Sequence, residues 1–169
     1  YELRLFMRFL IYGILAVGLN VLVGFTGLVS LGQAGLFAVG AYAAAILSVR
    51  FGFDLVSSAI VGVTAASLLG ALLAYPTVRV RGVYLAVVTI AFGLIIENIA
   101  IEWHSVTGGT MGLSGVPSPN PFGIALSTHS YYVLLAAILF VTALFIHNLK
   151  NSRFGRMMFA VAQSEIAAR

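Results

Sequence analysis

The sequence predicts an all-α membrane protein, a polytopic transmembrane helical bundle of about five spans that ends in a cytoplasmic helix. Of the 169 residues, 61% are hydrophobic and 8% are charged, whereas a soluble domain carries roughly 25% charged residues. Several apolar runs approach the ~20 residues that a bilayer crossing requires. The basic residues fall between these runs, as markers of membrane topology do.

Five candidate spans follow from the lengths of the apolar runs. They are Phe9 to Ser30, Ala34 to Val49, Leu55 to Tyr75, Val83 to Ile101 and Tyr131 to His147. The second run is short for a bilayer crossing. After the fourth run, the segment Glu102 to Ser130 is the only sizeable loop of this predicted topology.

Small residues recur at four-residue steps in two of the predicted spans. The third span carries Gly62, Ala66, Gly70 and Ala74, and the second carries Gly40, Ala44 and Ser48. Residues four apart share one face of a helix, and small side chains let two backbones approach closely in lipid. We therefore expect both stripes to be packing faces, although glycine is also simply frequent in membrane helices.

The basic residues predict the orientation of the chain. A cytoplasmic C-terminal tail places six of them inside, namely Arg79, Arg81, Lys150, Arg153, Arg156 and Arg169, and leaves Arg4, Arg8 and Arg50 outside. Cytoplasmic loops are enriched in Lys and Arg, so this orientation is favoured. Five spans then place Tyr1 outside. Because the chain also lacks an initiator methionine, we expect it to be a piece of a longer protein with an earlier helix.

The residues argue against an enzyme and against a nucleic-acid-binding protein. No basic stripe is interleaved with aromatic residues, and the lack of cysteine excludes thiolate catalysis and Cys-based zinc sites. Glu97 and Glu102 are five apart and fall on different faces of a helix. The three histidines lack metal-ligand spacing. We expect no catalytic residue, no metal and no cofactor.

The stretch "TGGTMGLSGVPSPNP" (Thr107 to Pro121) predicts an ordered external loop. Gly109, Gly112 and Gly115 recur at three-residue steps and can supply positive φ, and the prolines that follow stop any helix. A phosphate-binding loop would need a lysine after the glycines and then a helix, and neither is present.

Within this loop, Gly112 to Gly115 also fits the G-x-S-G pattern of rhomboid-like intramembrane serine proteases. Such a protease needs a histidine base within hydrogen-bond reach of Ser114. The same loop holds His104 and His129. A match of four residues is a weak signal, and we keep this activity only as an alternative from a different class.

Polar residues inside predicted spans are candidates for a translocation path, because polar and charged groups are expensive in hydrocarbon. They are Asn20 near the middle of the first span, Gln33 in the turn after it, and Glu97 and Asn98 toward the outer end of the fourth. Each could instead be an anchor for an interhelical hydrogen bond.

The C-terminal stretch "NSRFGRMMFAVAQSEIAAR" (Asn151 to Arg169) predicts a short amphipathic helix. Apolar residues recur at helical spacing and the charged groups fall mostly between them, the apolar set being Phe154, Met158, Val161, Ala162 and Ile166. Such a helix can dock on a protein outside the membrane, or it can lie on anionic lipid.

Four blocks of the sequence resemble the permease subunits of branched-chain amino-acid ABC importers, and the LivM type in particular. In chain order they are "IYGILAVGLNVLVGFTGLVSLGQAGLFAVGAYAAA" (Ile11 to Ala45), "RVRGVYLAVVTIAFGLIIENI" (Arg79 to Ile99), "TGGTMGLSGVP" (Thr107 to Pro117) and "SRFGRMMFAVAQSEIAAR" (Ser152 to Arg169). Together they extend over nearly the whole chain.

The resemblance implies that residues 1–150 form part of a transmembrane permease core and residues 151–169 begin a cytoplasmic coupling loop. Residues of this loop that would engage an ATPase subunit are Arg153, Gly155, Arg156, Glu165, Ala167 and Ala168, the last three at the positions of the family's Glu-Ala-Ala motif. The family pattern continues beyond this motif with a glycine and several more helices, so we expect only part of the pore lining here.

The resemblance also implies a function and a set of partners. The chain would transport branched-chain or other hydrophobic amino acids across the bacterial inner membrane, together with a second permease subunit, two cytoplasmic ATPase subunits and an extracytoplasmic substrate-binding protein. ATP would bind to the ATPase subunits and not to this chain. A urea or other small-solute permease of the same family and a passive channel stay open as alternatives.

Overall fold

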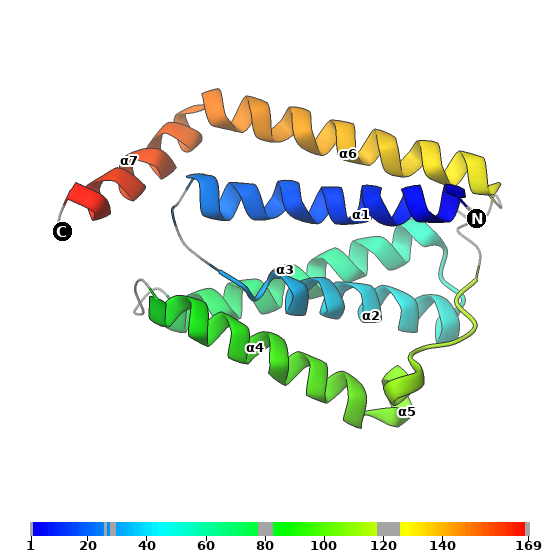
Figure 1. Cartoon of the computed structure of the whole chain (residues 1–169). Helices are drawn as coiled ribbons and strands as arrows, with labels where there is room; N and C mark the ends of the chain where they lie inside the picture. The colour runs from blue at the N-terminus through cyan, green and yellow to red at the C-terminus, as the bar shows by residue number, and fades with distance from the viewer. Residues whose placement is uncertain (1, 26, 28–29, 78–82, 118–125, 168–169) are drawn as a thin grey trace. The chain divides into compact units, whose positions relative to one another are not determined.

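The computed structural model describes residues 2–25, 27, 30–77, 83–117 and 126–167. Every regular element in these residues is helical, and the α-helices are α1 (Glu2–Asn20), α2 (Gln33–Phe51), α3 (Leu55–Thr77), α4 (Val83–Glu102), α5 (His104–Thr107), α6 (Thr128–Asn151) and α7 (Arg153–Ala167) (Figure 1). A π-turn, η1 (Val21–Phe25), continues α1, and a 3₁₀ turn, η2 (Gly109–Met111), follows α5. Within the described residues, five helices are long and apolar enough to cross a membrane. The predicted all-α polytopic fold is confirmed.

Four of the five helices extend beyond the predicted spans, and α6 for example runs from Thr128 to Asn151. The first is shifted toward the N-terminus: it begins at Glu2 rather than Phe9 and includes Arg4 and Arg8, and with η1 it ends at Phe25, so the predicted end at Ser30 is wrong. Selecting apolar residues alone misses these ends, because a helix continues through the polar interface beyond the hydrocarbon layer. The side chain of Ser127 caps α6 by accepting a hydrogen bond from the Ser130 N–H at 3.3 Å.

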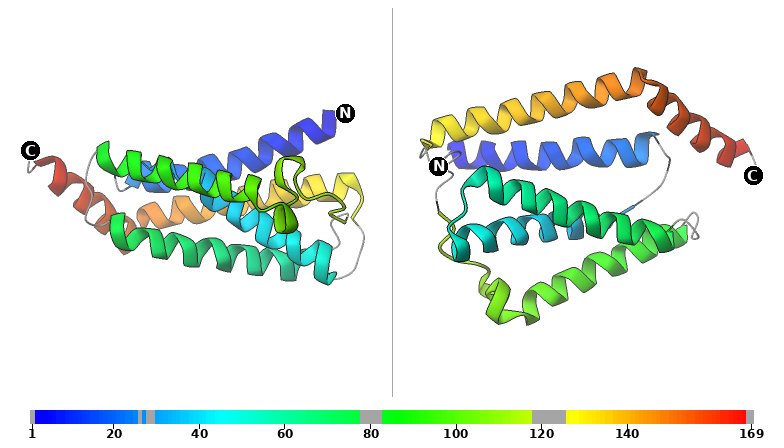
Figure 2. Two further views of the ribbon diagram at one scale, coloured as in Figure 1. Left: turned by 90° about the horizontal axis from the view of Figure 1, so that it is seen from below. Right: turned by 180° about the vertical axis from the view of Figure 1, so that it is seen from behind.

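The chain divides into two compact units. In the first, α1 and α6 lie side by side and run in the same direction (Figure 2). Close packing occurs where Gly13 faces Leu139, since a β-carbon at Gly13 would lie 3.5 Å from a Leu139 methyl group. Arg4 and Arg8 thus lie at one end of this pair, and Lys150 lies at the other, next to α7. This separation is the one that the predicted orientation requires.

In the second unit, α2 packs against α3 through the two predicted stripes of small residues. A β-carbon on Gly62 would lie 2.6 Å from the carbonyl oxygen of Gly40, and one on Gly40 would lie 3.5 Å from the β-carbon of Ala66. The backbones therefore touch where glycine removes the side chain. Gly70 continues the contact further along, against the methyl groups of Leu36. The prediction that both stripes are packing faces is confirmed.

The same helix also packs against α4, to which it runs parallel. A β-carbon on Gly35 would lie 2.9 Å from the Phe92 ring and 3.2 Å from the α-carbon of Gly93. Just before α2, the Leu31 N–H donates to the Thr89 hydroxyl at 3.0 Å, and that hydroxyl donates to the Ala86 carbonyl oxygen. The contacts Gly35–Gly93 and Leu31–Thr89 both pair residues 58 apart, so they fix the register of the two helices.

Candidate functional site

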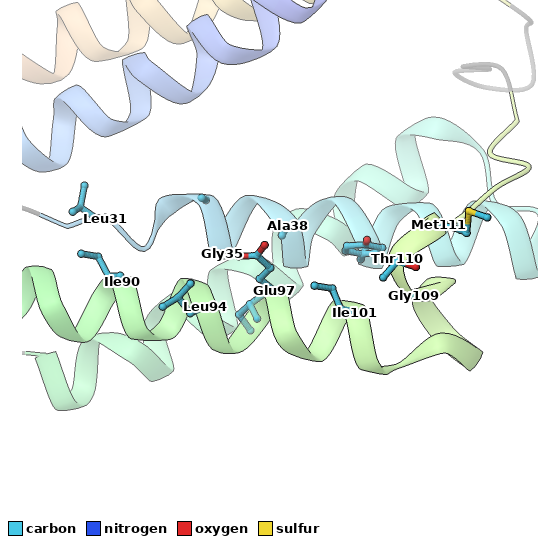
Figure 3. Close-up of a pocket in the computed structure, with 16 residues that line it drawn as sticks. Leu31, Gly35, Ala38, Ile90, Leu94, Glu97, Ile101, Gly109, Thr110 and Met111 are labelled. Carbon is cyan, nitrogen blue, oxygen red and sulfur yellow. The ribbon is translucent and has the colours of Figure 1, made fainter.

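A groove of about 660 Å³ lies between α2 and α4 and reaches η2 (Figure 3). Sixteen residues line it, which are Leu31, Ala34, Gly35, Ala38, Tyr42, Ile90, Gly93, Leu94, Ile96, Glu97, Ala100, Ile101, Gly109, Thr110, Met111 and Gly112. Small residues on both helices leave this space open. The volume is in the range of small-molecule sites, roughly 300–1,000 Å³.

Glu97 is the charged residue of this lining. Figure 3 shows its carboxyl group projecting from α4 toward the side of α2 that carries Gly35 and Ala38. It forms no hydrogen bond or ion pair with any residue that the structure describes. The other side chains in the lining that can form hydrogen bonds are those of Tyr42 and Thr110. The lining of the groove is therefore apolar, with one acidic group, the Glu97 carboxyl, on its wall.

The hydroxyl of Thr107 holds the loop at the end of the groove against α4. It contacts the carbonyl oxygens of Ala100 and Trp103, at 2.6 and 2.9 Å, and accepts a hydrogen bond from the Gly109 N–H at 3.2 Å. Thr107 is 6% exposed. Buried hydroxyl groups are stable when they are paired in this way, so the start of the glycine-rich loop is an ordered part of the site.

The three glycines of the predicted external loop all have positive φ, at 63° for Gly109, 71° for Gly112 and 82° for Gly115. The predicted role of these glycines in the backbone is confirmed, because other residues rarely adopt such angles. Gly109 also touches the His104 ring, which leaves no room for a β-carbon. Two of the three, Gly109 and Gly112, line the groove.

Ser114 lies in this loop as an exposed residue. Among the described residues of the same compact unit, its hydroxyl makes no hydrogen bond with His104. The pairing of Ser114 with His104 that a rhomboid-like protease could use is therefore not formed in this structure.

Arg50, near the end of α2, bridges to α5. Its guanidinium donates hydrogen bonds to the carbonyl oxygens of Ser105 and Val106. An arginine can satisfy the free carbonyl groups of a short helix in this way. The contact ties the end of α2 to α5, which follows α4, and both hydrogen bonds of the guanidinium go to backbone carbonyl oxygens.

The other predicted path residues lie elsewhere. Asn98 donates to the Leu94 carbonyl oxygen of its own helix at 2.8 Å, and Gln33 is the first residue of α2. Asn20 is the last residue of α1, where the α-helix changes to the π-turn, and not the middle of a span. It lines a second cavity of about 480 Å³, between α1 and α6, with His147 and Lys150.

The predicted amphipathic helix is α7, and its start is set by Ser152. The Ser152 hydroxyl accepts a hydrogen bond from the Gly155 N–H at 3.1 Å, which is an N-cap. A β-carbon on Gly155 would lie 2.8 Å from the Lys150 carbonyl oxygen, so the sharp joint with α6 requires glycine there. The Arg156 guanidinium donates to the Asn151 carbonyl oxygen at 2.9 Å.

The predicted coupling residues divide between the joint and the far end of α7. Arg153 begins the helix and is exposed, whereas Gly155 is buried at the joint. Glu165 and Ala167 lie in the last turn. Ala168 lies outside the described residues.

Sequence reasoning missed Thr89 and Thr107. The Thr89 hydroxyl donates to a carbonyl oxygen of its own helix and accepts the Leu31 N–H from outside it. The Thr107 hydroxyl contacts the Ala100 carbonyl oxygen of the preceding helix, α4, and accepts the Gly109 N–H that follows α5. The sequence offers one signal for Thr107, its position directly before two glycines. No comparable signal marks Thr89, because a threonine that bonds only within its helix has the same sequence context.

The described residues show three features of a multi-pass membrane transport permease. These are five membrane-length helices, a groove between two of them, and an amphipathic helix after the last one. A model of the family described as branched-chain amino acid transport system / permease component matches residues 2–169. The chain belongs to this family.

Two relatives, from Escherichia coli (strain K12) and Salmonella typhimurium (strain LT2), carry the same name, high-affinity branched-chain amino acid transport system permease protein LivM. The chain is 34% identical to each over an alignment of 184 positions. This alignment covers 95% of the chain and 43% of either relative. The chain thus spans less than half the length of these relatives. No solved structure gives a significant match. The resemblance stated from the four sequence blocks, including the LivM type, is confirmed.

Proposed function

We propose that the chain forms part of the membrane pathway of an ATP-driven importer, which carries branched-chain or other hydrophobic amino acids across the bacterial inner membrane. The family match over residues 2–169 is the observation that carries this proposal. The names of the two relatives supply the substrate class. Residues 1–150 act as the permease core in this proposal, and residues 151–169 begin the coupling loop.

The proposed partners are a second permease subunit, two cytoplasmic ATPase subunits and a substrate-binding protein on the opposite side of the membrane. The geometry of α7 supports an ATPase contact. It is amphipathic, it is held rigidly to α6 by the Ser152 cap and the Gly155 joint, and it exposes Arg153, Phe154 and Met157. A helix presented in this way can insert apolar side chains into a groove and orient itself by the charges at the rim.

Replacement of Glu165 by Arg tests the coupling role. In the full-length protein, reconstituted with its partners in proteoliposomes, Glu165→Arg should abolish ATP-driven leucine uptake and reduce co-purification of the ATPase. The membrane fold should survive, as judged by an unchanged elution profile in detergent. Glu2→Arg makes the same charge change in the first turn of α1 and serves as the control, with uptake retained.

Full uptake and full ATPase association in Glu165→Arg would contradict the coupling role, and uptake that is independent of ATP would indicate a passive channel. Orientation has its own test. These 169 residues contain no cysteine. With any cysteines elsewhere in the full-length protein removed, an introduced Arg156→Cys should react with an impermeant maleimide only from the cytoplasmic side. Labelling from the opposite side would contradict the proposed topology.

A further inference from the structure

We propose that the groove between α2 and α4 binds the translocated amino acid, with the Glu97 carboxylate holding its ammonium group. This rests on the proposed function for the identity of the substrate. The site itself rests on the charge, the lining and the dimensions of the groove.

The position of Glu97 favours a cationic partner. The residue lies five positions before the end of α4, inside a membrane-length helix. Glu97 is exposed in this chain taken alone, and a carboxylate within a membrane-spanning helix is expensive unless it is paired or hydrated. Among the residues that the structure describes it has no partner. The basic group on the neighbouring helix, Arg50, is occupied by the carbonyl oxygens of Ser105 and Val106.

The rest of the groove fits an aliphatic side chain. Its walls are formed by residues such as Ala34 and Ala38 on α2 and Leu94 and Ile101 on α4. An apolar surface that faces one carboxylate complements a small molecule with a hydrocarbon part and a primary ammonium group, and a charge-assisted hydrogen bond would orient that molecule. The competing occupant is a basic side chain from another helix of the assembled transporter.

Site-directed labelling can follow the occupancy of the groove directly. Thr110 lines the groove from η2 and is exposed, so a Thr110→Cys probe should react with a maleimide and be shielded by a bound ligand. Ser114→Cys is the matched control, because Ser114 is exposed in the same loop but does not line the groove. The assay uses the full-length transporter in proteoliposomes, with native cysteines elsewhere in the assembly removed.

Three ligands distinguish the contribution of the substrate's amine from that of its carboxylate. Leucine and 3-methylbutylamine, which keep the amine, should slow labelling of Thr110→Cys, whereas 4-methylpentanoate, which lacks it, should not. In the Thr110→Cys protein, the further substitution Glu97→Gln should raise the leucine concentration that gives half of the maximal protection by at least about tenfold. The reason is the loss of a hydrogen bond to a charged group. Glu97→Asp should show a smaller loss. Glu102→Gln, five residues along the same helix and outside the groove, should change nothing.

Equal protection by the amine and by 4-methylpentanoate, or unchanged protection in Glu97→Gln, overturns the proposal. If no ligand protects and a basic residue of another helix cross-links to Glu97, that side chain is the partner and the proposal is also wrong. The comparison of the three ligands needs no substitution at Glu97, so it holds even if Glu97→Gln fails to assemble. If the proposed function itself is wrong, the transporter without substitutions will show no ATP-driven leucine uptake, which distinguishes that outcome from a failure of the groove proposal.

Discussion

The ring of Phe159 on α7 packs against the ring of Phe25 at the end of the π-turn, with the ring centroids 4.9 Å apart and the planes inclined by 38°. Phe25 is 5% exposed, which makes it one of the most buried apolar residues of the described chain. The contact joins the amphipathic helix to the end of α1. A force on α7 would therefore reach α1 at its π-helical end, and single π-bulges in helices occur frequently at functional sites.

Substitution of the two phenylalanines should reveal an interaction between them. In a double-mutant cycle with Phe25→Ala and Phe159→Ala, the interaction free energy should be about 0.5–1.5 kcal/mol, as for other aromatic pairs. Denaturation of the full-length protein in detergent measures it. Phe154→Ala is the control, because Phe154 is 69% exposed, and its effect should add to that of Phe25→Ala within about 0.5 kcal/mol. Additivity of the Phe25 and Phe159 changes would disprove the coupling.

Gly62 and Gly70 should respond differently to the same substitution. Gly62→Ala places a β-carbon 2.6 Å from the Gly40 carbonyl oxygen and should destabilise the protein by about 1–3 kcal/mol. Gly70→Ala meets the Leu36 methyl groups at 3.7 Å, an ordinary contact. It should be neutral, or stabilising by about 0.5–1 kcal/mol through the helix preference of alanine. Thermal unfolding in detergent compares the two, and equal shifts would show that α2 and α3 do not touch at Gly62.

Thr89→Val should destabilise the junction of α2 and α4. The substitution keeps the shape but leaves the part-buried Leu31 N–H without its acceptor, which should cost about 1 kcal/mol, the lower end of the range for an unpaired donor. Thr89→Ser should retain most of the stability. Thr64→Val is the control, since the exposed Thr64 hydroxyl bonds only to the Val61 carbonyl oxygen of its own helix. If Thr64→Val and Thr89→Val lower the unfolding temperature equally, the hydrogen bond to Leu31 has no special role.

Two adjacent serines of α3 should give opposite results when replaced by alanine. Ser58 is 3% exposed, and its hydroxyl has no hydrogen-bond partner among the described residues. Ser58→Ala should therefore stabilise the protein by about 1 kcal/mol, because it removes an unpaired buried polar group. Ser57 donates to the carbonyl and carboxylate oxygens of Asp54 at the start of α3, so Ser57→Ala should destabilise it by about 1 kcal/mol. The unfolding temperature in detergent distinguishes the two, and a loss of stability in Ser58→Ala would reveal a partner for its hydroxyl.

The sequence predicted the elements better than the contacts between them. Apolar run length located five helices, and the four-residue steps of Gly40 and Gly62 predicted a packing face, because both signals are local and repeat at the helical period. The groove depends on the register of α2 against α4, which Gly35 and Thr89 set across 58 positions of chain. A single sequence carries no local signal for such a pairing. For the same reason Glu97 was predicted as a polar residue of a span, but its apolar surroundings were not.

The two-sided packing of α2 has a mechanical consequence. Its backbone touches α3 at Gly40 and α4 at Gly35, and Leu31 and Arg50 fasten its two ends. A helix clamped in this way cannot slide or rotate on either neighbour without breaking close-packed contacts. The three helices should therefore move as one rigid block, so the groove between α2 and α4 should keep its width when that block moves.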